Sequence, residues 1–400
     1  MNIVIIANFP SKIEGEKEKG RFLYLGEMLA DKGHSVTMLV SDFMHATKEK
    51  RSYIYDGYKT KIIALHEPGY KNNISIKRLW SHFRWGKNVY KYLKSHQEPD
   101  VIYCAVPSLT AGVMASRYCQ MRSVKFIIDI QDLWPEAFLM KIHIRMLQKA
   151  LLPLTWYANR IYKAADFIVA VSNTYVNRAL SINNKIREGI SVFLGNDGQF
   201  FDQSKHENNN PTGTIKIAYI GTLSYSYDIK CVMDALVIYN NYNNLPKVLF
   251  VVMGDGPLRS EFENYAELRG VDVEFTGKLP YSNMVSKLCN CDIVVNPIVK
   301  GSAASIINKV GDYALSGLPV INTQESQEYR NLIEKYQCGI NCNCADAEDV
   351  AEAIIKLVKD ENLRKRMGGN SRLLGEERFD RRFTYKVIVD LIEKNGKSYV

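Results

Sequence analysis

The feature that most constrains the fold is the alternation of short apolar runs with longer amphipathic segments. The strand-like runs of the first half lie at 2–7, 35–40, 100–104, 124–129, 167–171 and 190–194, and those of the second half at 214–220, 247–253, 271–275, 292–296, 318–322 and 338–341. Apolar strands joined by helix-length segments are typical of parallel sheets that are covered by helices on both faces. The alternation therefore predicts an α/β fold.

A polar stretch at 202–213, with an Asn run, a Pro and a Gly, separates the two halves of this pattern. Its composition is typical of a linker or a long loop. We therefore predict two Rossmann-like domains that face each other across a cleft, at 1–200 and 201–380. Ligands of such sheets bind beyond the carboxyl ends of the strands. A final amphipathic helix within 381–400 is expected to pack back toward the N-terminal domain.

The basic charge of the chain is concentrated in its first half. The net charge is +9, and residues 1–200 hold 28 Lys and Arg against 17 Asp and Glu. A net charge this small does not indicate binding to nucleic acid, and we expect no nucleic-acid partner. The segment 70–94 combines basic with aromatic residues, which suits an anionic membrane surface. An amphipathic helix that packs its aromatic face on the sheet is the alternative.

The eight Cys do not form a metal signature. Cys289 and Cys291, like Cys342 and Cys344, are separated by one residue, whereas paired zinc ligands usually have about two to four residues between them. No Asp-x-Asp pair is present either, so we expect no metal site. Free Cys suit a cytosolic protein. The N-terminus lacks the features of a signal peptide, and no apolar run approaches the about 18 residues of a membrane helix.

Three glycine-bearing turns follow predicted strands. The first extends to Gly20 and lacks both GxGxxG and the P-loop GK[ST], which disfavours a dinucleotide-dependent enzyme. The second contains Gly221, Thr222 and Leu223, and the third begins at Gly254. Gly lets the backbone approach a phosphate closely, so these turns are candidate phosphate sites. An ordinary turn between strand and helix is the alternative for each.

The segment 296–321 leads from a strand through a loop of small residues and a short helix to the next strand. Lys309 and Asp312 are three residues apart and therefore share one face of that helix. A cation near phosphate oxygens and a carboxylate near ribose hydroxyls would suit a nucleoside diphosphate. A surface ion pair fits the same spacing.

Three carboxylates, Asp129, Asp132 and Glu136, stand at the end of a predicted strand of the N-terminal domain. Side chains at that edge of the sheet are expected to face the cleft. An Asp at a strand end is also a common helix cap, and this alternative stays open.

Taken together and in order, these stretches resemble the retaining GT-B glycosyltransferases of family 4. The further segments that carry the resemblance are 165–172, Asn196-Asp197-Gly198, 254–257, 275–279 and 317–321. Two segments, 132–136 and 308–313, resemble the branch that builds bacterial capsule or O-antigen repeat units on undecaprenyl diphosphate.

The resemblance implies a metal-independent enzyme without a cofactor, which transfers a sugar from a nucleotide diphosphate sugar, most simply a UDP-sugar. The acceptor would be an undecaprenyl-diphosphate-linked glycan, and the enzyme would be peripheral on the cytoplasmic face of the membrane. Asp132 and Lys309 would be the catalytic residues. The donor would be bound by Gly20, Gly221, Thr222, Leu223, Gly254, Gly277, Lys278, Leu279, Ser302, Ala304, Ser305, Ile306, Ile307, Asn308 and Asp312.

The chain departs from the family pattern at three positions. Asp312 occupies the second acidic position of the family's Glu-x7-Glu motif, but Ala304 stands at the first. Thr222 and Tyr227 stand where the family carries Arg and Lys, and Lys309 or Lys230 is expected to replace a lost cation. These departures motivate an alternative, a catalytically degenerate protein that binds a glycosyltransferase or a lipid-linked glycan. A GT-B-shaped sugar-nucleotide epimerase is a second alternative.

Overall fold

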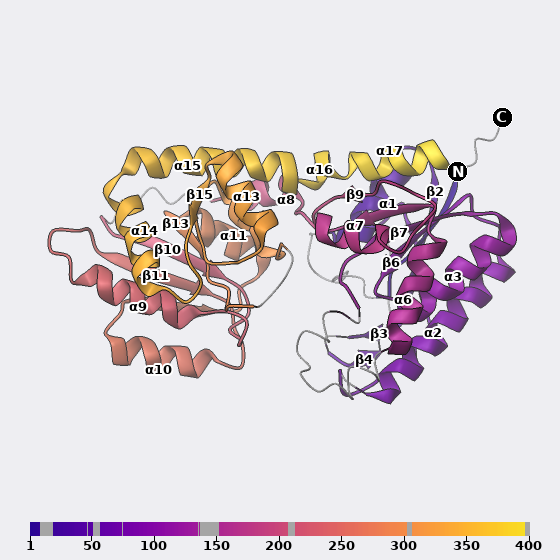
Figure 1. Cartoon of the computed structure of the whole chain (residues 1–400), viewed down its shortest axis with the longest axis horizontal. Coiled ribbons are helices and arrows are strands. Elements are labelled where there is room, and N and C mark those ends of the chain that lie inside the picture. The colour runs from indigo at the N-terminus through magenta and orange to yellow at the C-terminus, as the bar shows by residue number, and fades with distance from the viewer. Residues whose placement is uncertain are drawn as a thin grey trace. The chain divides into compact units, whose positions relative to one another are not determined.

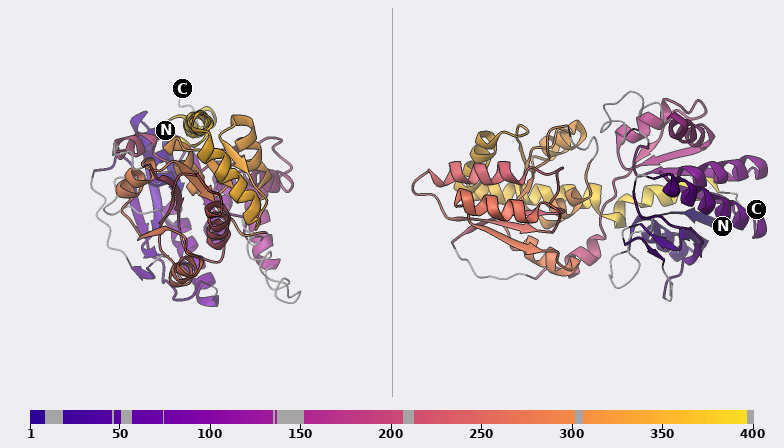
Figure 2. Two further views of the ribbon diagram at one scale, coloured as in Figure 1. Left: turned by 90° about the vertical axis from the view of Figure 1, so that its left-hand side faces the viewer. Right: turned by 90° about the horizontal axis from the view of Figure 1, so that it is seen from below.

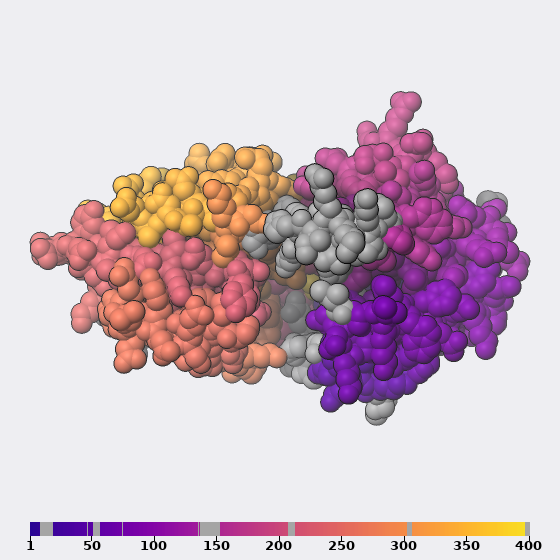
Figure 3. Space-filling model, turned by 60° about the horizontal axis from the view of Figure 1, so that its bottom comes forward, coloured from indigo at the N-terminus to yellow at the C-terminus, as the bar shows by residue number. Residues whose placement is uncertain are grey.

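Buried apolar runs form the strands of two separate parallel sheets in the structure, a computed structural model (Figures 1 and 2). It describes residues 1–8, 19–45, 47–50, 57–73, 75–134, 136, 152–206, 213–301 and 306–396. The chain divides into a first unit, Met1–Phe193 with Tyr385–Val400, and a second unit, Leu194–Thr384. Figure 3 shows one face of each unit in space-filling form, with the other residues in grey.

The first unit is built on a parallel sheet with the order β5-β2-β1-β6-β7-β8-β9. The strands are β1 (Asn2–Ile6), β2 (Ser35–Ser41), β5 (Lys61–Leu65), β6 (Val101–Val106), β7 (Lys125–Ile130), β8 (Phe167–Ala170) and β9 (Ile190–Ser191). The short strands β3 (Phe43–Met44) and β4 (Glu49–Lys50) form a separate antiparallel pair. The sequence pattern did not predict β5, because this edge strand is only partly buried and its apolar run, at 62–65, is short.

Helices cover both faces of this sheet (Figure 1). They are α1 (Arg21–Asp31), α2 (Ile76–Ser95), α3 (Leu109–Arg122), α6 (Leu152–Ala164), α7 (Asn173–Leu180) and α17 (Lys386–Asn395). The C-terminal helix α17 lies against α1, and Ile388, Val389 and Ile392 are buried in the same core as Leu25 and Leu29. The core of the first unit is therefore completed by a segment from the far end of the chain.

The second unit repeats this plan with the sheet order β12-β11-β10-β13-β14-β15, again all parallel. The strands are β10 (Ile215–Ile220), β11 (Val248–Met253), β12 (Val273–Gly277), β13 (Ile293–Asn296), β14 (Val320–Asn322) and β15 (Gly339–Asn341). The order reverses beside β10, and such a switch point is where doubly wound sheets bind ligands. The predicted α/β class with two Rossmann-like sheets is confirmed.

The helices of the second unit begin with a short one that follows the boundary between the units. They are α8 (Gly198–Gln203), α9 (Ile229–Asn240), α10 (Arg259–Arg269), α11 (Tyr281–Cys289), α12 (Lys309–Ser316), α13 (Gln327–Tyr336), α14 (Ala347–Lys359), α15 (Glu361–Leu374) and α16 (Arg381–Thr384). A single π-helical turn, Gly375–Phe379, continues α15. Among the described residues, no helix is both long and apolar enough to span a membrane.

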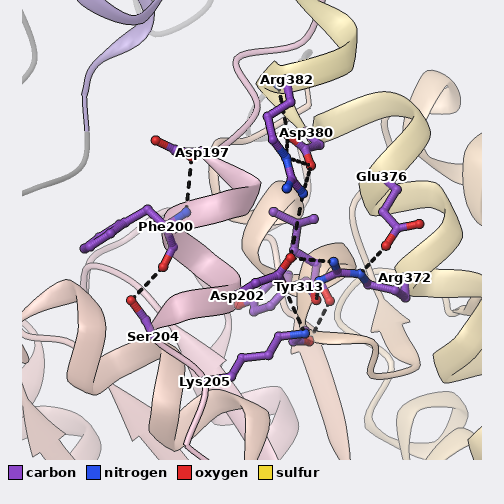
Figure 4. A network of polar contacts seen from close by, with 12 residues as sticks. Asp197, Phe200, Asp202, Ser204, Lys205, Tyr313, Arg372, Glu376, Asp380 and Arg382 are labelled. Carbon is purple, nitrogen blue, oxygen red and sulfur yellow. Dashed lines mark hydrogen bonds and ion pairs between the residues drawn. The ribbon is translucent and has the colours of Figure 1, made fainter.

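A polar network joins α8 to the end of α15 and to the residues that follow it (Figure 4). Arg372 donates to both carboxylate oxygens of Asp202, at 2.7 and 2.9 Å, and its Nε donates to Glu376. Arg382 Nε donates to Asp380 Oδ2 at 2.8 Å. The residues after Phe193 belong to the second unit, where the backbone N–H of Asn196 donates to the carbonyl oxygen of Phe379 at 2.8 Å, whereas the sequence pattern placed the division at residue 200.

Candidate functional site

Two glycine turns meet at the switch point of the second sheet. Gly221 and Gly254 directly follow β10 and β11 and have φ values of +142° and +153°, where side chains are strained. A Cβ atom on Gly254 would collide with the carbonyl oxygen of Gly221, and one on Gly256 would collide with the backbone of Leu223. The turns therefore pack backbone against backbone, which only glycine allows.

A cavity of about 320 Å³ opens beside these turns, within the size range of small-ligand sites. It lies where β10, β11 and β12 end. It is lined by Ile220, Gly221, Thr222, Met253, Gly254, Asp255, Lys278, Leu279, Met284 and Lys309. The structure thus brings together five of the residues that the family resemblance assigned to the donor and Lys309, which it assigned to catalysis.

Lys309 is the charged group at the inner wall of this cavity. It begins α12, and its Nζ donates to the Tyr219 hydroxyl at 3.0 Å and lies 3.5 Å from the centre of the Tyr227 ring. A Cβ atom on Gly221 would collide with Nζ, so the glycine also makes room for the cation. No carboxylate within the described ranges pairs with this amine. Burial lowers the pKa of Lys309 to about 7.

The sequence did not identify the two tyrosines as neighbours of Lys309. Tyr219 lies near the end of β10 and is fully buried, and Tyr227 occupies the position where the family carries Lys. Their rings face the ammonium group, and a cation over an aromatic face is stabilised when both are withheld from water. Lys230 is the other residue that was expected to replace the family's missing cation. It forms a surface ion pair with Glu261 at 2.6 Å instead.

Asp312 and Lys309 lie on the same short helix but have different hydrogen-bond partners. Its Oδ1 accepts a hydrogen bond from Asn196 Nδ2 and another from the Tyr281 hydroxyl, both at 2.7 Å. The carboxylate is largely buried and is not part of the cavity lining. Asn196 also forms a backbone bridge to Asp380. A role of Asp312 in holding the donor ribose stays a prediction.

The remaining donor-binding predictions have three outcomes. Ser302, Ala304 and Ser305 lie outside the described residues. Leu223 and Ile306 are buried apolar side chains, and Ile307 and Asn308 lead into α12. Gly277 ends β12 with a φ of +71° and bridges to Gly254, which places the neighbouring Lys278 and Leu279 at the cavity.

In the first unit the strand-end carboxylates divide into different roles. Asp129 is fully buried and accepts from Arg21 Nε and from the Tyr103 hydroxyl, both at 2.7 Å, so the expectation that it faces a cleft is wrong. A carboxylate at this depth requires such partners, because an unpaired buried charge is very costly. Glu136 accepts from Arg178 Nε at 2.6 Å.

Asp132 is partly exposed at the end of the loop that follows β7. Its Oδ1 accepts from the backbone N–H of Leu133 at 2.9 Å, and its Oδ2 accepts from Trp134 Nε1 at 3.3 Å. Gly20, the other predicted residue of this unit, is the extended residue before α1. Asp132 and Lys309 belong to different units, and a joint catalytic role for them stays a prediction. Among the described residues, no group of His, Cys, Asp and Glu could hold a metal ion.

Comparison with known proteins gives a consistent result for both units. Residues 21–187 match the family model Glycosyltransferase Family 4, and residues 200–374 match Glycosyl transferases group 1. A protein of Methanocaldococcus jannaschii described as an uncharacterized glycosyltransferase is 24% identical over 253 residues, or 58% of this chain. The match spans 60% of that relative's length.

Solved structures resemble the whole chain in fold. HepE from Anabaena in complex with UDP has a TM-score of 0.70 and 14% identity, over 98% of this chain and 100% of that one. WaaG, a glycosyltransferase involved in lipopolysaccharide biosynthesis, has a TM-score of 0.64 and 15% identity, over 98% of this chain and 99% of that one. At these identities the likeness shows the fold alone.

Proposed function

The chain belongs to the glycosyltransferases of the GT-B fold, and from that premise we propose that it transfers a sugar from a UDP-sugar to a lipid-linked glycan. The observation that carries the donor assignment is the buried cation Lys309 at the wall of a glycine-lined cavity. Three features suit a diphosphate there: a cation without a carboxylate partner among the described residues, close backbone, and the Thr222 hydroxyl.

The proposed chemistry is substitution with retention at the anomeric carbon of the donor. The bond from this carbon to the diphosphate oxygen breaks while the acceptor hydroxyl attacks from the same face, and the hydroxyl proton passes to the leaving diphosphate. Negative charge grows on that diphosphate as the bond breaks. A protonated Lys309 next to it would stabilise the transition state more than the ground state.

Helix α2 supports a membrane-borne acceptor. Its exposed face begins with Ile76, Leu79 and Trp80, which are 86%, 47% and 50% exposed. The exposed basic residues along the helix are Lys77, Arg84, Lys87, Lys91 and Lys94. Apolar side chains beside a basic stripe suit the surface of an anionic bilayer. We therefore propose that the protein works at the cytoplasmic face of the membrane, on a lipid-linked glycan of capsule or O-antigen type.

The donor proposal is tested by thermal unfolding of the full chain with UDP, GDP, CDP, dTDP or ADP at millimolar concentration. A ligand at about 100 times its Kd adds roughly 2.7 kcal/mol of stability, which is a shift of a few degrees for a chain of this size. We expect UDP to give the largest shift. A larger shift with another nucleotide would contradict the UDP assignment, and no shift with any of them would favour the degenerate binding protein.

A further inference from the structure

We propose that the first unit contains a binding site for a phosphate or diphosphate group, built around Arg78 and Lys48. The site lies where α2 begins, next to the β3–β4 pair. The inference rests on the proposed function, because a lipid-linked diphosphate glycan is an acceptor with such a group.

Arg78 lies over two aromatic rings. Its guanidinium carbon lies 4.5 Å from the centre of the Trp134 ring and 5.4 Å from that of Tyr70. Nη1 donates to the carbonyl oxygen of Asn73 at 2.7 Å, but Nε is buried and has no hydrogen-bond partner among the residues that the structure describes. A buried donor without a partner costs about 1–3 kcal/mol, and such a group calls for an explanation. An anion that accepts from the edge of the guanidinium provides one.

Lys48 adds a second cation to the same place. Its Nζ lies 4.9 Å from the centre of the Tyr70 ring, 3.2 Å from His45 Nδ1 and in contact with the side-chain oxygen of Asn73. The pKa of Lys48 is lowered by burial and by the charge of Arg78. Within the part of the chain that the structure describes, neither Lys48 nor Arg78 forms an ion pair with a carboxylate.

The other titratable groups packed here are one carboxyl group and two imidazoles. Glu67 is fully buried and accepts from the hydroxyls of Ser41 and Ser81 at 2.6 and 2.8 Å. Burial raises the pKa of Glu67 and lowers the pKa of Arg78, and the charge of Glu67 partly offsets the shift at Arg78. Burial also lowers the pKa of His45 to about 4 and that of His82 to about 3, so both rings are neutral at neutral pH. Two cations therefore lie near one carboxyl group whose oxygens the two serines already hold.

The backbone adds to this preference for an anion. Arg78 lies in the first turn of α2, a long helix that Ser75 caps and that has no acidic residue in its first turn. The amino end of a helix carries partial positive charge, so a cation there is unfavourable unless an anion joins it. The Trp134 ring already has two neighbours, the Arg78 guanidinium at 4.5 Å and the His82 ring, which stacks with it at 6.4 Å. The site therefore offers charge more than an aromatic platform, which fits a phosphoryl group better than a sugar ring.

The test is titration calorimetry of the full chain with inorganic pyrophosphate, after saturating UDP has filled the donor site. We expect the wild type to bind pyrophosphate and Arg78→Gln to weaken the binding by about tenfold or more, the scale of a charge-assisted hydrogen bond. Lys48→Gln, at a partly exposed turn, is expected to weaken it as well and covers the case that Arg78→Gln does not fold. The matched control is Arg117→Gln, an exposed arginine on α3 of the same unit, which should bind within about twofold of wild type.

Each outcome has a defined meaning. No binding to the UDP-loaded wild type, equal binding by Arg78→Gln and Lys48→Gln, or equally tight binding of citrate would overturn the phosphate site. Absence of UDP binding would contradict the proposed donor and leave the Arg78 comparison to be made without UDP. Geranyl diphosphate distinguishes the sources of the group. If geranyl diphosphate binds more tightly than pyrophosphate, the site recognises a prenyl-linked acceptor. If the two bind equally, the site recognises the phosphate alone.

Discussion

At the scale of a single residue, the surroundings of Lys309 in the second unit favour the binding of an anion. Two tyrosine rings and Gly221 surround its amine, and the described residues provide no carboxylate partner. Burial without a counterion disfavours the charged form, which is why the pKa of Lys309 falls to about 7. A bound diphosphate would supply the counterion and raise this pKa again.

The first prediction is that Lys309→Ala weakens UDP binding by about 1.5–3 kcal/mol, because a charge-assisted bond is lost. Without UDP, Lys309 loses its proton above pH 7, whereas Lys309 in the complex with UDP keeps it. Binding of UDP above pH 7 is therefore coupled to the uptake of a proton. The wild-type affinity should therefore fall by up to about tenfold per unit between pH 7.5 and 8.5, where the diphosphate of UDP is almost fully ionised and its uracil is still neutral. Calorimetry at several pH values measures both effects.

Lys230→Ala is the control for this prediction, since Lys230 is ion-paired with Glu261 on the surface of the same unit. It should keep both the affinity and the pH dependence of the wild type. If Lys309→Ala retained a steep pH dependence above pH 7, the proton uptake would belong to another group.

The second prediction concerns Asp312. If its carboxylate holds the donor ribose, Asp312→Asn should lower the affinity for UDP and leave the affinity for pyrophosphate unchanged, whereas Lys309→Ala should lower both. The amide can still accept from Asn196 and Tyr281, so the loss of stability should stay near 1 kcal/mol. Calorimetry and thermal unfolding test the two statements. Unfolding of Asp312→Asn would show a structural role instead.

At the scale of the element, the two tryptophans of α2 have different surroundings. Trp85 is fully buried, and its Nε1 donates to the carbonyl oxygen of Val40 at 3.3 Å, so this ring packs on the sheet. Trp80 is half exposed, next to Ile76 and Leu79. The two alternatives for the aromatic residues of this segment therefore apply to different faces of one helix.

The third prediction is that Trp80→Ser weakens binding of the full chain to vesicles that contain anionic lipid and hardly changes its melting temperature. The physical reason is that an exposed ring loses membrane contact but no core packing. Vesicle sedimentation at low and high salt is the measurement. The control Met121→Ser alters another exposed apolar residue of the first unit, on α3, and should bind as the wild type does. Binding that ignores lipid charge and salt would contradict the membrane proposal.

At the scale of the whole molecule, the first unit is assembled from both ends of the chain. Helix α17 places Ile388, Val389 and Ile392 in the core that α1 and the sheet form. Glu393 of the same helix accepts from Lys32 Nζ at 2.6 Å. The stability of the first unit therefore depends on residues that follow the second unit in the sequence.

The fourth prediction is that Ile392→Ala destabilises the first unit by about 2–5 kcal/mol, the cost of a large-to-small change in a packed core. Val387→Ala on the same helix is the control, because Val387 is half exposed and should change stability by no more than about 0.5 kcal/mol. Urea unfolding followed by the fluorescence of the tryptophans, which all lie in the first unit, measures the difference. Equal stability of the two variants would contradict the packing of α17.

The class of the fold could be predicted from the sequence, because the alternation of apolar and amphipathic segments is a local property. The sequence also located the turns of Gly221 and Gly254 and singled out Lys309, since each depends on neighbours in the chain. Three contacts became visible only in the folded chain: Tyr219 and Tyr227 surround Lys309, Asp129 pairs with Arg21, and Arg78 lies over the rings of Trp134 and Tyr70. These contacts join residues far apart in the sequence, and no periodicity encodes which distant side chain closes a buried site. The same holds for α17, whose apolar face is visible in the sequence but whose partner is chosen by packing.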